Sequence, residues 1–168
     1  MSTLPTRRAR RRPGATAALA CALGGLLALS GAAGAQDGIE SVASPHDVPG
    51  TVDRLVAALE SKGLTVFDRI DHGANAEGAG LELGATEVLL FGNPKLGTPL
   101  MRCAPTAAID LPQRMLAFVD GGGGTRLAWN DPAWLAERHG IDPEGECAEV
   151  LATVAGALEN FAKAATAP

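Results

Sequence analysis

Aromatic residues are scarce in this chain of 168 residues, which contains four phenylalanines, two tryptophans and no tyrosine. An aromatic platform for stacking bases or sugar rings is therefore not expected, and the core must be built mainly from aliphatic side chains. The common catalytic motifs are absent too: the sequence has no G-x-S-x-G, no Walker loop and no H-E-x-x-H. No cofactor is predicted, since the glycines at 121–124 lack the strand–helix context of a dinucleotide site.

Basic residues are few beyond the first twelve positions. Five of the 14 Lys and Arg residues lie within 7–12, and residues 36–168 keep nine of them against all 19 acidic residues, a formal charge of −10. Binding to nucleic acid requires a basic surface, so nucleic acid is not an expected partner. An anionic membrane surface is disfavoured for the same reason.

The N-terminal segment has the pattern of a secretory signal peptide. Arginines at 7–12 precede an apolar run of small residues at 15–32, and Ala33-Gly34-Ala35 offers a cleavage site before Gln36. We therefore predict a leader over 1–35 and a single domain over 36–168, located in the periplasm or outside the cell, with no membrane contact after cleavage.

Other processing routes stay open for this segment. An uncleaved membrane anchor is less favoured because Gly24-Gly25 interrupts the apolar run, and a lipoprotein is less favoured because the residues before Cys21 fit that signal poorly. Arg7-Arg8 would suit twin-arginine export, but Arg10 stands where that signal requires an apolar residue. General secretion is the better prediction.

Hydrophobic periodicity predicts an α+β fold. A helix capped by Thr51 and ending at Gly63 has apolar residues at i, i+3, i+4 and i+7, and a longer stripe runs from Cys147 to Phe161. Leu64, Val66 and Ile70 are expected on one face of their strand. Strands are predicted at 38–44, 64–70, 86–91, 113–119 and 126–129, with one helical turn near Ala76 and a flexible glycine turn at 120–124. This pattern predicts an antiparallel sheet packed against a long C-terminal helix.

The segment Phe91–Met101 follows a buried strand and contains two cap-then-proline pairs, Asn93-Pro94 and Thr98-Pro99. Each pair is typical of a helix start. Two starts so close together leave room for one helical turn between them, and Gly97 is expected to adopt a positive φ where that turn ends. Asp131-Pro132 and Asp142-Pro143 repeat the device. The central loop could direct backbone N–H groups and Lys95 toward an anion. Alternatively, it is a rigid connection with Lys95 in solvent.

Several of these motifs together resemble the DUF302 family. They are Ile70-Asp71-His72, Ala76, Gly80, Leu83, the whole of Phe91–Met101, Asp110-Leu-Pro112 and Arg138-His139. The resemblance covers about residues 38–140 and implies a TATA-binding-protein-like α+β domain in the order β-α-β-β-β-β-α, one that often assembles with itself. A homodimer is therefore expected. The family has no assigned biochemical role, so the resemblance supplies no catalytic residues; the four-glycine turn departs from its pattern.

Two histidines and two cysteines are candidates for chemistry. Asp71 could orient His72 for acid–base work, although adjacent strand residues point to opposite faces, and His72 could instead bind a backbone carbonyl. His139 is predicted to cap a helix that Gly140 ends. Cys103 and Cys147 are predicted to form a disulfide in an oxidising compartment. The alternatives are two separate thiols, or a copper site with Met101 and His72, but no metal site is our prediction.

The favoured function is binding of a small polar or anionic molecule near Asn93, Lys95, Thr98, His72 and Asp71. One alternative is an acid–base enzyme that uses Asp71 and His72. Another is a structural module whose apolar surface mediates self-association. The sequence predicts a small-molecule ligand without identifying it.

Overall fold

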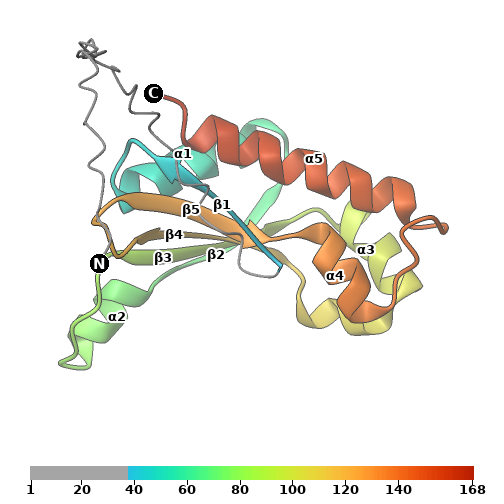
Figure 1. Ribbon diagram of the computed structural model, residues 1–168, viewed down its shortest axis with the longest axis horizontal. Coiled ribbons are helices and arrows are strands. Elements are labelled where there is room, and N and C mark those ends of the chain that lie inside the picture. The colour runs from blue at the N-terminus through green and yellow to red at the C-terminus, as the bar shows by residue number, and fades with distance from the viewer. Residues whose placement is uncertain (1–37) are drawn as a thin grey trace, which may run out of the picture. The chain divides into compact units, whose positions relative to one another are not determined.

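A five-stranded sheet with helices on one face forms the framework of the protein (Figure 1). The computed structural model describes residues 38–168; the predicted leader and its cleavage site lie outside them. The elements follow one another as β1 (Ile39–Ser44), α1 (Val48–Ser61), β2 (Thr65–Asp71), α2 (His72–Gly78), β3 (Thr86–Gly92), α3 (Pro94–Cys103), the 3₁₀ helix η1 (Pro105–Ile109), β4 (Gln113–Val119), β5 (Thr125–Asn130), α4 (Pro132–His139) and α5 (Ala148–Ala165).

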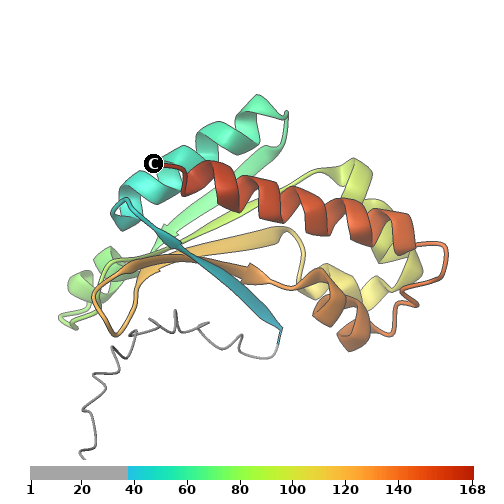
Figure 2. The same cartoon turned by 45° about the horizontal axis from the view of Figure 1, so that its top comes forward.

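The sheet is antiparallel throughout, with strand order β1-β5-β4-β3-β2. The helices α1 and α5 pack against each other over the same face, as both views show (Figures 1 and 2). The predicted order β-α-β-β-β-β-α is therefore confirmed, with α2, α3, η1 and α4 inserted between its members. Within residues 38–168, no helix is both long and apolar enough to cross a membrane.

The core lies between the sheet and its two long helices. Every second residue of β3 and β4 is buried, as expected for strands with one face on a helical layer. Phe91 on β3 meets Phe161 on α5 edge to face, with ring centres 6.3 Å apart. Their neighbours are aliphatic, as the composition predicts: Val52, Leu55, Leu59, Leu89, Met115, Leu127, Val154 and Leu158.

Helix α1 begins four residues earlier than predicted. Its N-cap is Asp47, whose carboxylate accepts a hydrogen bond of 2.9 Å from the Gly50 amide, so the assignment of Thr51 as the cap is wrong. Thr51 is instead fully buried, and its hydroxyl donates to the Asp47 carbonyl and contacts the Ser44 hydroxyl. Thr51 was mistaken for a cap because threonine is a common N-cap residue; here its hydroxyl is buried and bonds to Asp47 and Ser44 instead.

Strand β2 contains a β-bulge between Val66 and Asp68. Val66 pairs with Phe91 on the helix-covered side, whereas Ile70 pairs with Val88, whose neighbours Leu89 and Phe91 mark the opposite side. The expectation that Leu64, Val66 and Ile70 share one face is therefore wrong, because the bulge reverses the alternation.

The two predicted helix starts of the central segment belong to one helix. Asn93 caps α3 as predicted, but Thr98-Pro99 lies inside it, and Gly97 is helical without a positive φ. Likewise Asp131 caps α4, whereas Asp142-Pro143 starts only a turn, in which Asp142 accepts from the Glu144 amide. A cap-then-proline pair therefore marks a helix start only where the following residues can continue the helix.

The glycine turn between β4 and β5 is organised by Asp120. One carboxylate oxygen of Asp120 accepts hydrogen bonds from the amides of Gly122 and Gly124, at 2.9 and 3.0 Å. Gly123 has a φ of +81°, which a glycine adopts without strain. The hydrogen bonds to the Asp120 carboxylate thus fix a turn whose four glycines have no side chains to order it.

Candidate functional site

An apolar groove opens where β3 ends and β4 begins. Its volume is about 500 Å³, with α3 on one side and α5 above it. Phe67, which is 56 % exposed, lies at its rim, and the almost fully buried Phe91 and Leu158 lie at its base. The other lining residues are Leu64, Gly92, Asn93, Pro94, Leu96, Gly97, Thr98, Leu100, Met101, Ala108, Leu111, Pro112, Gln113, Val154, Ala157 and Phe161.

The lining contains no charged residue. Its polar side chains are Asn93 and Thr98 from the central segment and Gln113 from the start of β4. Such a surface favours an apolar body and can orient it with a few hydrogen bonds, as in many small-molecule sites. An ionised group inside the groove would lose its hydration without gaining an opposite charge.

The central segment uses its own backbone donors to build α3. The Asn93 side chain accepts from the Lys95 amide at 2.9 Å, and the Asn93 carbonyl accepts from the amides of Leu96 and Gly97 at 2.9 and 3.0 Å. Lys95 is exposed and does not line the groove. The N–H groups on which the anion hypothesis rested are therefore largely engaged within the helix.

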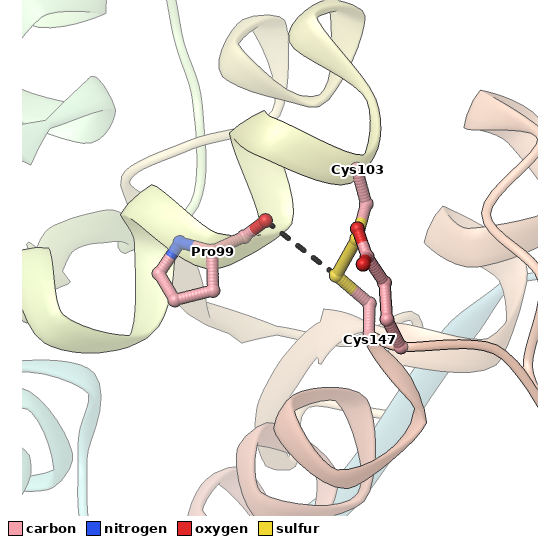
Figure 3. Close-up of a disulfide and its surroundings, with 4 residues drawn as sticks. Pro99, Cys103 and Cys147 are labelled. Carbon is pink, nitrogen blue, oxygen red and sulfur yellow. Dashed lines mark hydrogen bonds between the residues drawn. A yellow bond between two sulfur atoms is a disulfide. The ribbon is translucent and has the colours of Figure 1, made fainter.

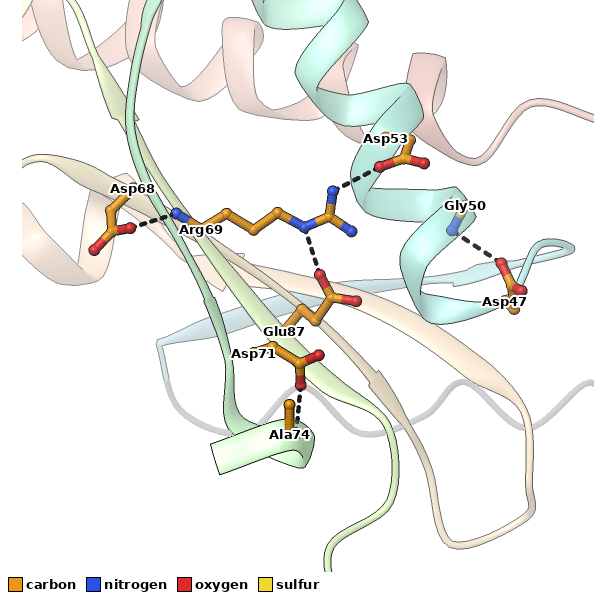
Figure 4. Close-up of polar contacts among 8 residues, drawn as sticks. All are labelled: Asp47, Gly50, Asp53, Asp68, Arg69, Asp71, Ala74 and Glu87. Carbon is orange, nitrogen blue, oxygen red and sulfur yellow. Dashed lines mark hydrogen bonds and ion pairs between the residues drawn. The ribbon is translucent and has the colours of Figure 1, made fainter. Parts of the chain in front are cut away.

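Asp71 and His72 lie at the other end of β3. The antiparallel register pairs Asp71 with Glu87, whereas the groove end of β3 is paired at Thr65 and Gly92. Asp71 caps α2 by accepting from the Ala74 amide at 2.8 Å, as Figure 4 shows. Both side chains are exposed, and no hydrogen bond joins them. The structure thus does not bring the predicted residues together: Asn93 and Thr98 line the groove, while Lys95, Asp71 and His72 do not.

A polar cluster of Glu87, Arg69 and Asp53 lies beside Asp71. Glu87 is 94 % buried in its side chain and accepts from Arg69 Nε at 2.5 Å, while Arg69 also contacts Asp53 on α1 at 2.6 Å (Figure 4). The hydrogen bond to Glu87 raises the pKa of Arg69 above its ordinary value, and the contact with Asp53 adds to the shift. These contacts neutralise a buried carboxylate and tie the sheet to α1.

His139 has a different role from the predicted helix cap. Its side chain is 95 % buried; Nε2 lies 2.7 Å from an Asp110 carboxylate oxygen and Nδ1 lies 3.1 Å from the Thr106 hydroxyl. Arg138 contacts the same carboxylate at 3.2 Å and stacks on Trp134 at 5.2 Å. Gly140 ends the helix as expected, with a φ of +64°. His139 therefore joins α4 to the segment that carries η1.

Cys103 and Cys147 form the predicted disulfide (Figure 3). Cys103 ends α3 and Cys147 precedes α5, so the bond joins the two helices that form the walls of the groove. The Cys147 sulfur also lies 3.5 Å from the Pro99 carbonyl oxygen. This is a van der Waals contact and not a hydrogen bond, because a disulfide sulfur has no proton to donate. With Cys103 bonded in this way, the copper alternative has no free thiol, and no group of three metal-ligating side chains occurs among the described residues.

Sequence reasoning singled out one wall of the groove, the segment Phe91–Met101, but missed the others. These come from α5, from Leu64 and Phe67, and from the segment 108–113, whose apolar residues look like ordinary core positions in the sequence. One signal was present: Gln113 occupies a position of β4 whose neighbours on the same face, Met115 and Ala117, are both buried and apolar.

Comparison with known proteins agrees with the fold. A family model described as "Domain of unknown function DUF302" matches residues 40–161. The chain belongs to the DUF302 family. The structure is also similar to the crystal structure of an uncharacterised conserved DUF302 protein from Bacillus stearothermophilus, with a TM-score of 0.67 and 18 % identity over 76 % of this chain and 97 % of that one. The predicted resemblance is thus confirmed.

Curated relatives carry the name of an ion channel. The chain is 44 % identical over 126 residues to the fluoride-specific ion channel FluC 1 of Brucella suis and to FluC 2 of Brucella melitensis, in each case over 74 % of this chain. It spans 50 % and 47 % of their respective lengths. The channel activity in those names belongs to proteins about twice as long as the matched region.

Proposed function

We propose that this DUF302 domain binds a small, largely apolar molecule in the groove between α3 and α5. The observation that carries the proposal is an uncharged groove of about 500 Å³ at the end of β3. That volume lies within the usual range of small-molecule sites, and an apolar lining with few polar groups is typical of them. The proposal keeps the predicted binding role but changes the ligand chemistry from polar or anionic to apolar.

The location of the protein is part of this proposal. A leader over 1–35 would export the domain to the periplasm or the medium, and a disulfide between Cys103 and Cys147 suits an oxidising compartment. Exposed Asp71 and His72 give no support to an acid–base enzyme, because they form no hydrogen bond with each other. That alternative and the self-association module stay predictions.

The test is titration of the purified protein with the neutral fluorescent probe N-phenyl-1-naphthylamine, whose emission rises in apolar surroundings. Wild type should bind the probe saturably. Ala157→Trp, which places a large side chain in the groove, should abolish saturable binding. Ala152→Trp is the matched control, since Ala152 is an exposed residue of α5 outside the groove.

Equal binding by both variants, or no saturable binding by wild type, would refute the proposal. Thermal unfolding of both variants checks that a loss of binding reflects a filled groove rather than an unfolded chain.

A further inference from the structure

Gln113 is the buried polar side chain of the groove. It is 9 % exposed and begins β4, opposite Phe91 of β3. Met115 and Ala117, the next residues on the same face, are fully buried beneath the helices. The Gln113 side chain therefore lies on the helix-covered side of the sheet, where it lines the groove beside Leu158 and Phe161.

The Gln113 side chain forms no hydrogen bond within residues 38–168, although an amide carries two donor hydrogens and an acceptor oxygen. In the same range, no unpaired side-chain N or O atom is completely sealed from solvent. The Gln113 amide must therefore open onto a cavity. Its donor hydrogens and acceptor oxygen are therefore available there to pair with water or with a polar group of a ligand.

Two cavities border this residue. Besides the groove, Gln113 lines a small cavity of about 20 Å³ together with His139, Leu135 and Ile141. That space is large enough for one water molecule, which would engage part of the amide. Gln113 also lines the groove, which of these two cavities is the one with room for a ligand.

We propose that Gln113 determines the specificity of the groove and selects a neutral amphiphile. Such a ligand has an apolar body and one uncharged hydrogen-bonding group, an amide, ester, ketone or alcohol, that pairs with the Gln113 amide. The uncharged lining selects against a carboxylate or phosphate at that position, because nothing there would neutralise it. This inference rests on the proposed binding function and adds the chemical class of the ligand.

The experiment displaces N-phenyl-1-naphthylamine with three probes of equal chain length: octanamide, octanoate at neutral pH, and octane. Wild type should bind octanamide more tightly than octanoate. In Gln113→Leu, which removes the amide at similar volume, the ratio of octanamide affinity to octane affinity should fall about tenfold, the value of one hydrogen bond to a buried group. Asn160→Leu is the matched control and should keep the wild-type ratio, since it removes an amide from an exposed residue of α5 that does not line the groove.

An unchanged ratio in Gln113→Leu would overturn the inference and indicate that water satisfies the amide. Tighter binding of octanoate than of octanamide by wild type would overturn the choice of a neutral ligand. Failure of the fluorescent probe itself to bind would reject the underlying function, so the two failures are distinguishable. If Gln113→Leu does not fold, Gln113→Met serves in its place, with the same expected change in the ratio.

Discussion

At the scale of single residues, Glu87 shows how a charge is kept inside this protein. Its side chain is 6 % exposed, whereas that of its partner Arg69 is 35 % exposed. Water can therefore solvate the charge of Arg69 but hardly that of Glu87, which relies on the arginine for neutralisation. Removing one member of a buried pair is costly, whereas replacing both by apolar residues is often neutral. The pair therefore contributes little net stability and mainly fixes β2 and α1 in place.

We predict that Arg69→Met lowers the free energy of unfolding by about 2–3 kcal/mol, because Glu87 is left buried without its partner. The double variant Arg69→Met/Glu87→Met should recover most of this loss. Urea denaturation measures both. A double variant that is as unstable as the single one would contradict this account.

The raised pKa of Arg69 determines how this contribution depends on pH. A raised pKa means that folding favours the protonated arginine, so its stabilisation is complete below the ordinary pKa and is lost only as the pH rises past it. Wild type and the double variant should therefore differ in stability by a constant amount from about pH 6 to about pH 9. A difference that changes steadily across this interval would show that another group controls it.

At the scale of elements, α3 and α5 form the groove together, yet 44 residues separate their cysteines in the chain. The groove therefore depends on how two distant helices are held against each other. The disulfide joins them at the end of α3, and the contacts of His139 with Asp110 and Thr106 hold the intervening segment to α4. The disulfide and the His139 contacts thus hold the elements that surround the groove, although none of their residues lines it.

Reduction of the disulfide, or the double variant Cys103→Ser/Cys147→Ser, should lower the free energy of unfolding by about 4 kcal/mol, the chain-entropy value for a loop of this length. Because α3 and α5 are then free to separate, affinity for N-phenyl-1-naphthylamine should also fall. Denaturation and titration with and without reductant measure the two effects. Unchanged affinity after complete reduction would show that packing alone holds the walls.

At the scale of the whole molecule, ligand binding and stability are linked. A ligand that binds only the folded chain raises its unfolding free energy, by about 2.7 kcal/mol at a hundred times its Kd. Octanamide should therefore raise the melting temperature of wild type in a concentration-dependent way and leave that of Ala157→Trp unchanged. Differential scanning calorimetry tests this, and an equal shift in both proteins would place the binding outside the groove.

Self-association also belongs to this scale and stays a prediction. Sedimentation velocity over a range of protein concentrations would test the expected homodimer. A species of constant monomer mass at every concentration would argue against it.

The sequence by itself determined the α+β order, the family and most element positions, because periodicity and capping act over a few neighbouring residues. It predicted β4 at Gln113–Val119 correctly, and it identified Asn93 as a helix cap and Cys103–Cys147 as a disulfide. The strand and the cap depend on a few neighbouring residues, and the disulfide was predicted because only two cysteines lie beyond the predicted leader.

Only the tertiary structure decided where the candidate site lies. The sequence analysis placed Asp71 and Asn93 in one ligand site, but the two residues lie at opposite ends of β3. The groove exists because α5 closes over the end of the sheet, and Gln113 is significant only because no partner reaches its amide within the described chain. Such features arise from packing between distant segments, which no local pattern encodes.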